Sequence, residues 1–563
     1  MEFLDFNVLI GGEAGQGLQT VGEAFSRALV RSGYRIHVTQ TYESRVRGGH
    51  NVFAIRFGAK EVLAPTEKVD LLVALNGETL FLHRQEMAPG GQALADEAWE
   101  IPEGISAVRA PYKSLSGNGF ANTVAMGVAG ALLRIREEVL AGALEQILGK
   151  GKASLAEANR RVLSSAYRWS KEHCTELEVP SPGAQAVPRI VLNGHEAVGL
   201  GAISAGVRFC AYYPMSPSTS VAMTLVQWSK EMSIIVEQAE DEIAAINMAI
   251  GASFAGLPSL VPTSGGGFAL MVEAVSLAAV SETPVVILIG QRPGPATGLA
   301  TRTEQADLEF VLHAGHGEFP RAVFAPGSIE ECFHLTRKAV ELAEKYQGPV
   351  FILTDHFLAD SYRDVEPFEV EDLDCVLPGE EPGAIPEGGY ARYAITPSGV
   401  SPRLLPGVSR HLVVADSHEH TEKGHITEDL SLRPKMVEKR LRKYQGLAQE
   451  VVPPSFSGPQ DPELLLVGWG STKGALQEAA SLLSRAGRKT SVLHFSQVWP
   501  LVDAQFLERL KQAKTTVCVE GNATGQLARL IRRETGFKFP MQVSRYDGLP
   551  MTPEYILARL ARQ

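Results

Sequence analysis

The chain has 563 residues, of which 45% are hydrophobic and 21% are charged, and its formal net charge is −11. This composition predicts several folded domains and argues against a disordered chain or a basic nucleic-acid-binding surface. The five cysteines form no CxxC pair, which argues against disulfides or a metal or iron–sulfur site held by this chain alone.

Short runs of β-branched residues alternate with Ala- and Leu-rich helical stretches, which predicts an α/β fold with parallel sheets in three domains. No apolar run reaches the roughly 20 residues that span a bilayer, and the acidic start does not resemble a signal peptide, so we expect a cytoplasmic protein without membrane contact. Pro/Gly-rich stretches at 179–188, 377–389 and 451–463 are typical of linkers or long loops. The expected domains are therefore 1–178, 189–375 and 462–563, with an irregular connecting segment over 376–461.

The first strand runs into the loop GGEAGQG at 11–17, which precedes a helix. Such loops expose backbone N–H groups that can hold an anion. A tight turn in an α/β domain is an equally good interpretation, because the loop matches neither a Walker A nor a GxGxxG motif. The candidate ligand-binding residues of this loop are Gly12, Gly15 and Gly17.

A basic turn, TYESRVRGGHNVFAIRFG, follows at 41–58. Arg47 precedes its glycine pair and could bind phosphate or carboxylate, although a solvated loop explains it as well. With the loop at 11–17 and the segment SGNGFANTVAMGVAG at 116–130, this turn resembles the gamma module of 2-oxoacid:acceptor oxidoreductases, apart from Glu13 and Ala14, where glycines are common. The resemblance implies that this module lies near coenzyme A or at a domain interface.

The segment YPMSPST at 213–219 follows a predicted strand, at the sheet edge where open α/β folds bind ligands. Its two prolines fix the backbone around a hydroxyl residue, and a rigid turn alone would explain a lone PxSP. The segment resembles the Tyr-Pro-Ile-Thr-Pro-Ser motif of the family's alpha module, whose hydroxyl residue contacts the 2-oxoacid. That resemblance assigns Ser216 to the substrate, and Tyr213, Pro214 and Pro217 to the cofactor pocket.

Acidic residues precede a helix of small residues in IIVEQAEDEIAAINMAIGASFAG at 234–256. A favourable interaction with the helix dipole is the plainest explanation. Thiamine diphosphate, however, needs a carboxylic acid at N1′ of its aminopyrimidine, in a dry pocket that raises the pKa of the acid. In the family this glutamate lies just before the AIGASxAG stretch, which places it at Glu242, with Glu240 as the alternative. The segment TSGGGFALMVE at 263–273 resembles a further glycine-rich turn near the cofactor.

The segment QRPGPATGLATRTEQAD at 291–307 places Arg292 at the end of a strand and Arg302 later in the same Gly/Pro loop. A guanidinium here suits bidentate binding of a carboxylate, although an arginine tied to its own loop is common. The segment resembles the alpha-module signature in which an arginine holds the substrate carboxylate. We assign that role to Arg292 first and to Arg302 second.

Two strand–loop–helix units, ELLLVGWGSTKGALQEAA at 463–480 and TTVCVEGNATGQLARLIRRE at 515–534, end the chain. They resemble the transketolase C-terminal-like domain of the same family. No GDG motif with a following Asn-Asn pair is present to bind diphosphate and magnesium. The resemblance therefore implies a fused gamma–alpha subunit that shares thiamine diphosphate with a separate beta subunit, which is expected to carry Mg²⁺ and a [4Fe–4S] cluster.

The implied reaction is the coenzyme-A-dependent oxidative decarboxylation of a 2-oxoacid to acyl-CoA and CO₂, with reduction of ferredoxin. We expect 2-oxoglutarate as the substrate and a hetero-oligomer, such as a dimer of gamma–alpha/beta pairs. Pyruvate or a branched-chain 2-oxoacid is the alternative within this class. A non-catalytic coenzyme-A-binding scaffold and a transketolase-like carboligase are the alternatives outside it.

Overall fold

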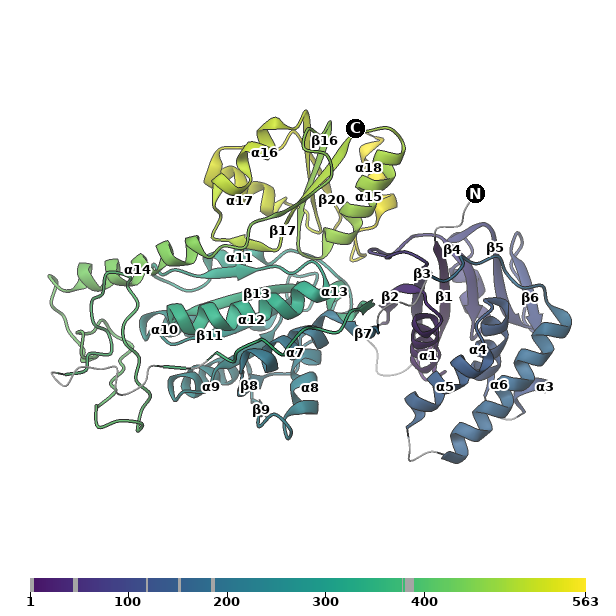
Figure 1. Ribbon diagram of the computed structural model, residues 1–563, viewed down its shortest axis with the longest axis horizontal. Helices are drawn as coiled ribbons and strands as arrows, with labels where there is room; N and C mark the ends of the chain where they lie inside the picture. Colours follow the sequence, from purple (N-terminus) through teal and green to yellow (C-terminus); the bar gives the residue numbers. More distant parts are fainter. Residues whose placement is uncertain are drawn as a thin grey trace. The chain divides into compact units, whose positions relative to one another are not determined.

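The computed structural model describes residues 5–43, 49–117, 120–149, 153–183, 188–376, 378–379 and 389–562. It confirms the α/β class, with three sheets that each contain parallel strand pairs (Figure 1). The chain forms two compact units: the first holds 1–192 with the short pieces 360–367 and 552–555, and the second holds the remainder. Within the described ranges, no helix combines the length and the apolar character that crossing a membrane requires.

The first unit is built on an eight-stranded sheet in the order β6-β5-β4-β1-β3-β2-β14-β7. β1 pairs parallel with β4 but antiparallel with β3, so this sheet is mixed. The carboxyl end of β1 leads directly into the glycine loop. The strands are β1 (Asp5–Glu13), β2 (Arg35–Thr41), β3 (His50–Gly58), β4 (Val69–Ala74), β5 (Met87–Asp96), β6 (Ser106–Ala110), β7 (Ile190–Asn193) and β14 (Tyr362–Val365).

Helix α1 packs a continuous apolar stripe against this sheet, including the fully buried Ala24, Phe25 and Ala28. Gly22 lets the helix approach closely, since a Cβ there would lie 2.4 Å from the Phe53 ring. The helices of the unit are α1 (Leu18–Arg31), α2 (Gly77–Leu82), α3 (Tyr112–Ser116), α4 (Ala121–Leu132), α5 (Glu137–Leu148) and α6 (Ala153–His173).

The second unit contains a seven-stranded sheet in the order β18-β12-β13-β11-β10-β8-β9, in which every pair except β12–β18 is parallel. The loops after β8, β10 and β11 therefore meet at one edge. The strands are β8 (Phe209–Tyr212), β9 (Ile235–Gln238), β10 (Ser259–Thr263), β11 (Val285–Gln291), β12 (Ala322–Phe324), β13 (Pro349–Asp355) and β18 (Gln497–Trp499). The helices are α7 (Gly194–Ala205), α8 (Thr219–Trp228), α9 (Glu242–Phe254), α10 (Gly265–Val280), α11 (Leu308–His313), α12 (Ile329–Tyr346) and α13 (His356–Asp360).

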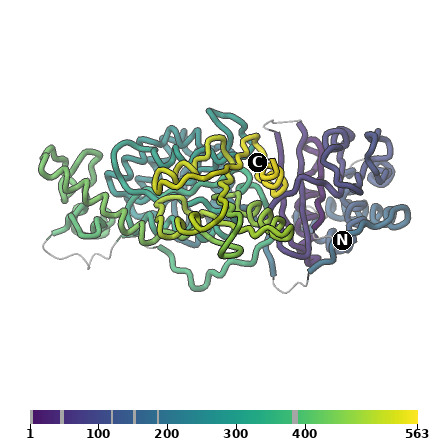
Figure 2. The backbone as a smooth tube through the Cα atoms, turned by 90° about the horizontal axis from the view of Figure 1, so that it is seen from above, coloured from purple at the N-terminus to yellow at the C-terminus, as the bar shows by residue number. Residues whose placement is uncertain are grey.

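A five-stranded sheet in the order β15-β17-β16-β19-β20 stacks over the seven-stranded sheet (Figures 1 and 2). The two share one hydrophobic core, in which Val467 and Ile531 join Val323 and Phe351. The strands are β15 (Ser455–Ser457), β16 (Leu464–Trp469), β17 (Thr490–Phe495), β19 (Thr515–Glu520) and β20 (Met541–Ser544). The helices are α15 (Lys473–Arg485), α16 (Leu507–Gln512), α17 (Gln526–Thr535) and α18 (Pro553–Leu560), with 3-10 turns η2 (Gly470–Thr472) and η3 (Asp503–Gln505).

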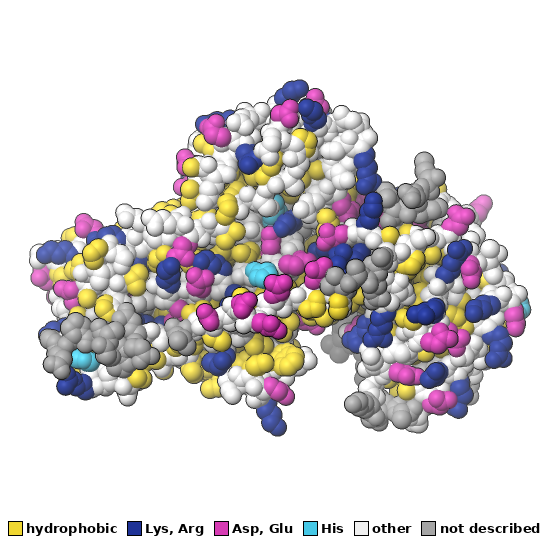
Figure 3. Space-filling model, in the orientation of Figure 1, with side chains coloured by type: hydrophobic (Ala, Val, Ile, Leu, Met, Phe, Trp, Pro, Cys, Tyr) yellow, Lys and Arg dark blue, Asp and Glu magenta, His cyan; other side chains and the backbone are white. Residues whose placement is uncertain are grey.

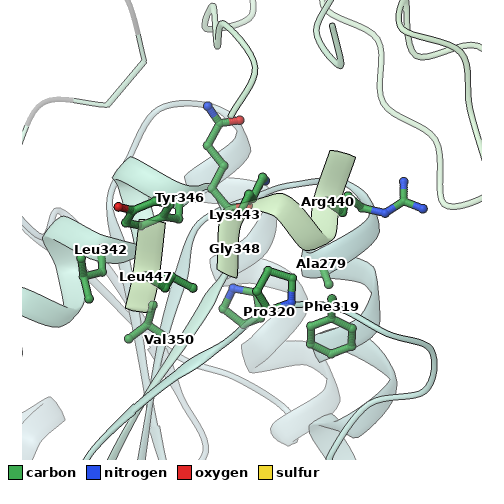
Figure 4. Close-up of a pocket in the computed structure, with 12 residues that line it drawn as sticks. Ala279, Phe319, Pro320, Leu342, Tyr346, Gly348, Val350, Arg440, Lys443 and Leu447 are labelled. Carbon is green, nitrogen blue, oxygen red and sulfur yellow. The ribbon is translucent and has the colours of Figure 1, made fainter. Parts of the chain in front are cut away.

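The connecting segment, which we expected to be irregular, contains the 17-residue helix α14 (Arg433–Gln449). Its buried face carries lysines: Lys439 and Lys443 lie 2.5 Å and 2.6 Å from the carboxylate oxygens of the buried Glu282. Figure 4 shows Lys443 and Leu447 of this helix lining a pocket together with Tyr346 and Gly348. A hydrophobic pattern does not reveal this helix clearly, because three of its five buried residues, Lys439, Arg440 and Lys443, are basic.

Candidate active site

Glu242 is the first residue of α9 and is only 4% exposed. Asp241 caps the helix, since its side chain accepts a hydrogen bond from the N–H of Ala244 at 2.7 Å. No hydrogen-bond partner for Oε1 of Glu242 exists among the described residues, whereas the alternative candidate, Glu240, is exposed. Of the two carboxyl groups, Glu242 is therefore the one held in a dry site.

A glycine turn between β10 and α10 makes room for this carboxylate. A Cβ atom at Gly267 would lie 2.7 Å from Oε1 of Glu242 and 2.4 Å from the Thr263 hydroxyl oxygen, so only glycine fits. No side chain caps the start of α10 at Ser264. Among the described residues, Oε1 of Glu242 thus lies without a hydrogen-bond partner beside a helix N-terminus that no side chain caps.

Arg292, directly after β11, is joined to the loop after β8. Its Nη1 donates a hydrogen bond to the carbonyl oxygen of Ser216 at 2.8 Å. A Cβ at Gly290 would lie 2.9 Å from Cγ of Pro217, so these two segments pack closely. Burial lowers the pKa of Arg292, although a guanidinium remains charged at neutral pH. The structure therefore brings together Ser216, Pro217 and Arg292.

The other predicted residues of this region make no described contact with that group. Tyr213 and Pro214 are exposed. Arg302 packs against the loop after β20, since a Cβ at Gly548 would lie 3.1 Å from Cβ of Arg302. Among the described residues no hydrogen bond links Arg302 to Ser216, in contrast to Arg292. This geometry favours the first of the two assigned arginines.

Asp307 is a residue whose position the sequence did not reveal. Its backbone N–H donates to Oε1 of Gln291 at 3.0 Å, and its carboxylate oxygens lie 2.5 Å and 2.7 Å from the place of a Cβ at Gly265. Oδ2 is buried and has no hydrogen-bond partner within the described ranges. Burial raises the pKa of Asp307 to about 6, against the opposing charge of Arg292. In the sequence this aspartate was only the last residue of a signature.

Gln305 holds the loop from Arg292 to Asp307 against the five-stranded sheet. Its Nε2 donates to the carbonyl of Trp469 at 2.9 Å, and its Oε1 accepts from the N–H of Gly521 at 2.8 Å. The side chain of Asn522 donates to the Gln305 carbonyl at 3.1 Å. The C-terminal motifs GWGS and VEGNATGQ therefore bind the loop of the candidate site. Sequence could not show this, because these partners are 164 to 217 residues away.

The glycine loop of the first unit borders a cavity of about 390 Å³. Helices α1 and α4 both begin at this cavity, and no side chain caps either of them. Gly15 and Gly17 have positive φ angles of 96° and 76°, and a Cβ at Gly17 would lie 2.3 Å from Nδ2 of Asn122. Uncapped helix N-termini favour anions. The apolar wall includes Leu75, Met126, Leu144, Leu148 and Leu155.

Gly12 and Arg47 are the remaining residues predicted for the first unit. A Cβ at Gly12 would lie 2.7 Å from Oε1 of Gln16 and 2.9 Å from Cβ of Leu75, so its role in the structure is close packing of the loop. Arg47 lies outside the described residues. In the part of the chain that is described, no group of three or more His, Cys, Asp or Glu side chains is arranged to hold a metal ion.

Comparison with known proteins covers both units. Residues 200–439 match the family model described as pyruvate flavodoxin/ferredoxin oxidoreductase, thiamine diphosphate-binding, and residues 7–169 match pyruvate ferredoxin/flavodoxin oxidoreductase. The chain is 32% identical to a 2-oxoacid:ferredoxin oxidoreductase subunit alpha from a Sulfolobus species, over 96% of this chain and 94% of that protein. It is 27% identical to the 2-oxoglutarate oxidoreductase subunit KorA of Mycobacterium tuberculosis, over 93% of this chain and 87% of that protein.

A solved structure is also similar over the full length of both chains. It is the 2-oxoglutarate:ferredoxin oxidoreductase from Magnetococcus marinus with 2-oxoglutarate, coenzyme A and succinyl-CoA bound. The TM-score is 0.93 and the sequence identity is 31%.

Proposed function

Because this chain belongs to the 2-oxoacid:ferredoxin oxidoreductase family, we propose that it is the subunit that binds the pyrimidine half of thiamine diphosphate and oxidises 2-oxoglutarate with coenzyme A and ferredoxin. Its gamma-type module would cover 1–178, its pyrimidine-binding module 189–375, its connecting segment 376–461 and its transketolase C-terminal-like module 462–563.

The buried, unpartnered Oε1 of Glu242 carries this proposal. A carboxyl group without a partner, kept dry beside a glycine turn, fits the N1′ atom of an aminopyrimidine. When bound, thiamine diphosphate supplies the carbanion chemistry that decarboxylates a 2-oxoacid. Glu242 would hold the proton at N1′, and the close packing around Gly267 would keep water away from it.

The pair Ser216 and Arg292 supports the 2-oxoacid as the substrate. A charged guanidinium at the carboxyl edge of a parallel sheet, beside a hydroxyl residue, suits a carboxylate with a neighbouring carbonyl group. The names of relatives and of the solved structure favour 2-oxoglutarate over pyruvate or a branched-chain 2-oxoacid. Arg302 is the second candidate for a substrate carboxylate.

The glycine-loop cavity supports coenzyme A as the second substrate. The uncapped starts of α1 and α4 would receive phosphate oxygens, with Gly12, Gly15 and Gly17 giving close backbone approach, and the apolar wall would receive uncharged parts of the ligand. Arg47 would add a cation to the same ligand.

Exposed apolar side chains on neighbouring elements of the second unit support a partner subunit. On α8, β9, α9 and α10, respectively, Met223 is 52%, Ile235 53%, Ile243 50% and Leu270 53% exposed. Figure 3 shows hydrophobic side chains gathered over α8. A beta subunit that carries Mg²⁺ and the [4Fe–4S] cluster would cover this face in a hetero-oligomer and pass electrons to ferredoxin. The five unpaired cysteines agree with a cytoplasmic location.

The test is co-expression with a candidate beta subunit, followed by assay of methyl viologen reduction with 2-oxoglutarate or pyruvate, with and without coenzyme A. We expect coenzyme-A-dependent reduction with 2-oxoglutarate and none by either subunit alone. Faster reduction with pyruvate would change the assigned substrate but not the proposed type of reaction. No reduction by an intact complex that holds its cluster and thiamine diphosphate would refute the catalytic role.

A further inference from the structure

Asp307 and Arg292 lie at one site without neutralising each other. They are linked through Gln291, which precedes Arg292 and accepts the backbone N–H of Asp307. Yet the Arg292 guanidinium donates to the Ser216 carbonyl, and Oδ2 of Asp307 is buried with no partner in the described ranges. The two charges interact through space, and no direct ion pair joins them. Asp307 thus keeps a hydrogen-bonding group for which the described residues supply no partner.

We propose that Asp307 binds the 2-oxoacid as a neutral carboxylic acid, which donates a hydrogen bond to a carboxylate oxygen of the substrate while Arg292 supplies the positive charge. Binding of the substrate then includes the uptake of one proton from solvent by the Asp307 carboxylate. This inference rests on the proposed function and adds to it a substrate-binding residue and a pH dependence.

The charges around Asp307 lead to this inference. The charged groups that interact with it are Arg292 at the end of β11 and Glu304 in its own loop. The carboxyl group of Glu242 packs against Gly267, two residues beyond the Gly265 that Asp307 packs against. If all three carboxyl groups were ionised, the site would carry more negative than positive charge and would repel an anionic substrate. Burial already raises the pKa of Asp307 to about 6, and a bound carboxylate would raise it further.

A purely structural role explains Asp307 less well. It occupies the N-cap position of α11, but its side chain makes no capping hydrogen bond there. Its backbone N–H, which any residue would supply, makes the contact with Gln291. The side chain faces Gly265, where the glycine leaves room for the carboxyl group. The carboxyl group itself is therefore what the surrounding structure accommodates.

The experiment is the pH dependence of KM and kcat for the 2-oxoacid in the assembled complex, between pH 5.5 and 8.5, with saturating coenzyme A and methyl viologen. For the unaltered complex we expect KM to be constant below about pH 6 and to rise by up to about tenfold per pH unit above it. Asp307→Asn, whose amide donates a hydrogen bond at every pH, should give a flat KM close to the low-pH value. Asp307→Ala should give a flat but higher KM, because the donor is gone.

Glu304→Gln is the matched control, since Glu304 is the neighbouring carboxyl group of the same loop. It should keep the rise in KM and move it slightly to lower pH, because one negative charge beside Asp307 is removed. A KM that does not rise with pH in the unaltered complex would overturn the inference, whether or not the variants fold. So would an Asp307→Asn profile parallel to the unaltered one. Absence of turnover with any 2-oxoacid would instead refute the proposed function.

Discussion

Two helices in this chain begin at glycine-rich turns, and the glycines are needed for different reasons. In the first unit, Gly15 and Gly17 precede α1 with positive φ angles, and the place of a Cβ at Gly15 is open space. In the second unit, Gly265 and Gly267 begin α10, and the carboxyl groups of Asp307 and Glu242 fill the places where their Cβ atoms would be. The first turn needs glycine for its backbone conformation, and the second needs it to make room for acidic side chains of its own chain. A glycine-rich motif alone therefore does not identify what binds there.

The largest expected effect comes from removing the acid at the second turn. Glu242→Gln preserves the shape of the side chain but cannot hold and release the proton at N1′, so we expect kcat to fall by about 10²- to 10⁴-fold. Methyl viologen reduction by the assembled complex measures this loss. Glu240→Gln, at an exposed position two residues earlier, should leave kcat within about twofold. Equal losses in the two variants would contradict the distinction between them.

Filling the second turn tests the packing itself. Gly267→Ala places a methyl group 2.4 Å from the Thr263 hydroxyl and 2.7 Å from Oε1 of Glu242, which should lower the free energy of unfolding by about 1–3 kcal/mol. Denaturant unfolding of the complex measures the change. Adding Thr263→Ala removes the closest contact and should restore part of the stability. No recovery in the double variant would show that the Thr263 contact is not the cause.

At the first turn, replacing a glycine by alanine should raise the KM for coenzyme A more than it lowers kcat. Gly17→Ala forces a left-handed backbone on alanine and a contact of 2.3 Å with the Asn122 side chain, so we expect a loss of about 1–2 kcal/mol in stability. We also expect KM for coenzyme A to rise while kcat changes little. The Gly17→Ala, Asn122→Ala double variant should recover only the part of the stability that the contact causes. A fall in kcat with unchanged KM would place the loop outside coenzyme A binding.

The smallest effect on stability is expected at Gly15, where a Cβ would meet nothing within 4 Å. Gly15→Ala should lower the free energy of unfolding by about 1 kcal/mol, because alanine is strained at a φ angle of 96°. Gly15→Asn should cost less, because asparagine tolerates this conformation better. Thermal unfolding compares the two variants. If KM for coenzyme A rises in both, the open space beside Gly15 belongs to the ligand.

The sequence was sufficient for the features that local patterns encode. The α/β class and strands such as β11 and β16 follow from short apolar runs. The candidate Glu242 came from the resemblance of the segment 234–256 to a family motif, and the structure adds that its carboxyl group is buried. Arg292 and Arg302 lie in one loop, so their sequence positions do not separate them; the structure shows that Arg292, and not Arg302, is hydrogen-bonded to Ser216 among the described residues. Asp307 and the buried lysines of α14 were missed because their partners are distant in sequence and leave no periodic pattern.

The hydrogen bonds of Gln305 have a consequence for protein engineering. One side chain joins the loop that starts at Arg292 to the carbonyl of Trp469 and to the N–H of Gly521, so the shape of the loop is encoded in three separated stretches of sequence. A loop exchanged between relatives to change the accepted 2-oxoacid would carry Gln305 to a new pair of partners. We therefore expect a chimera of two family members to fold correctly around this loop when the loop and the C-terminal domain come from the same protein.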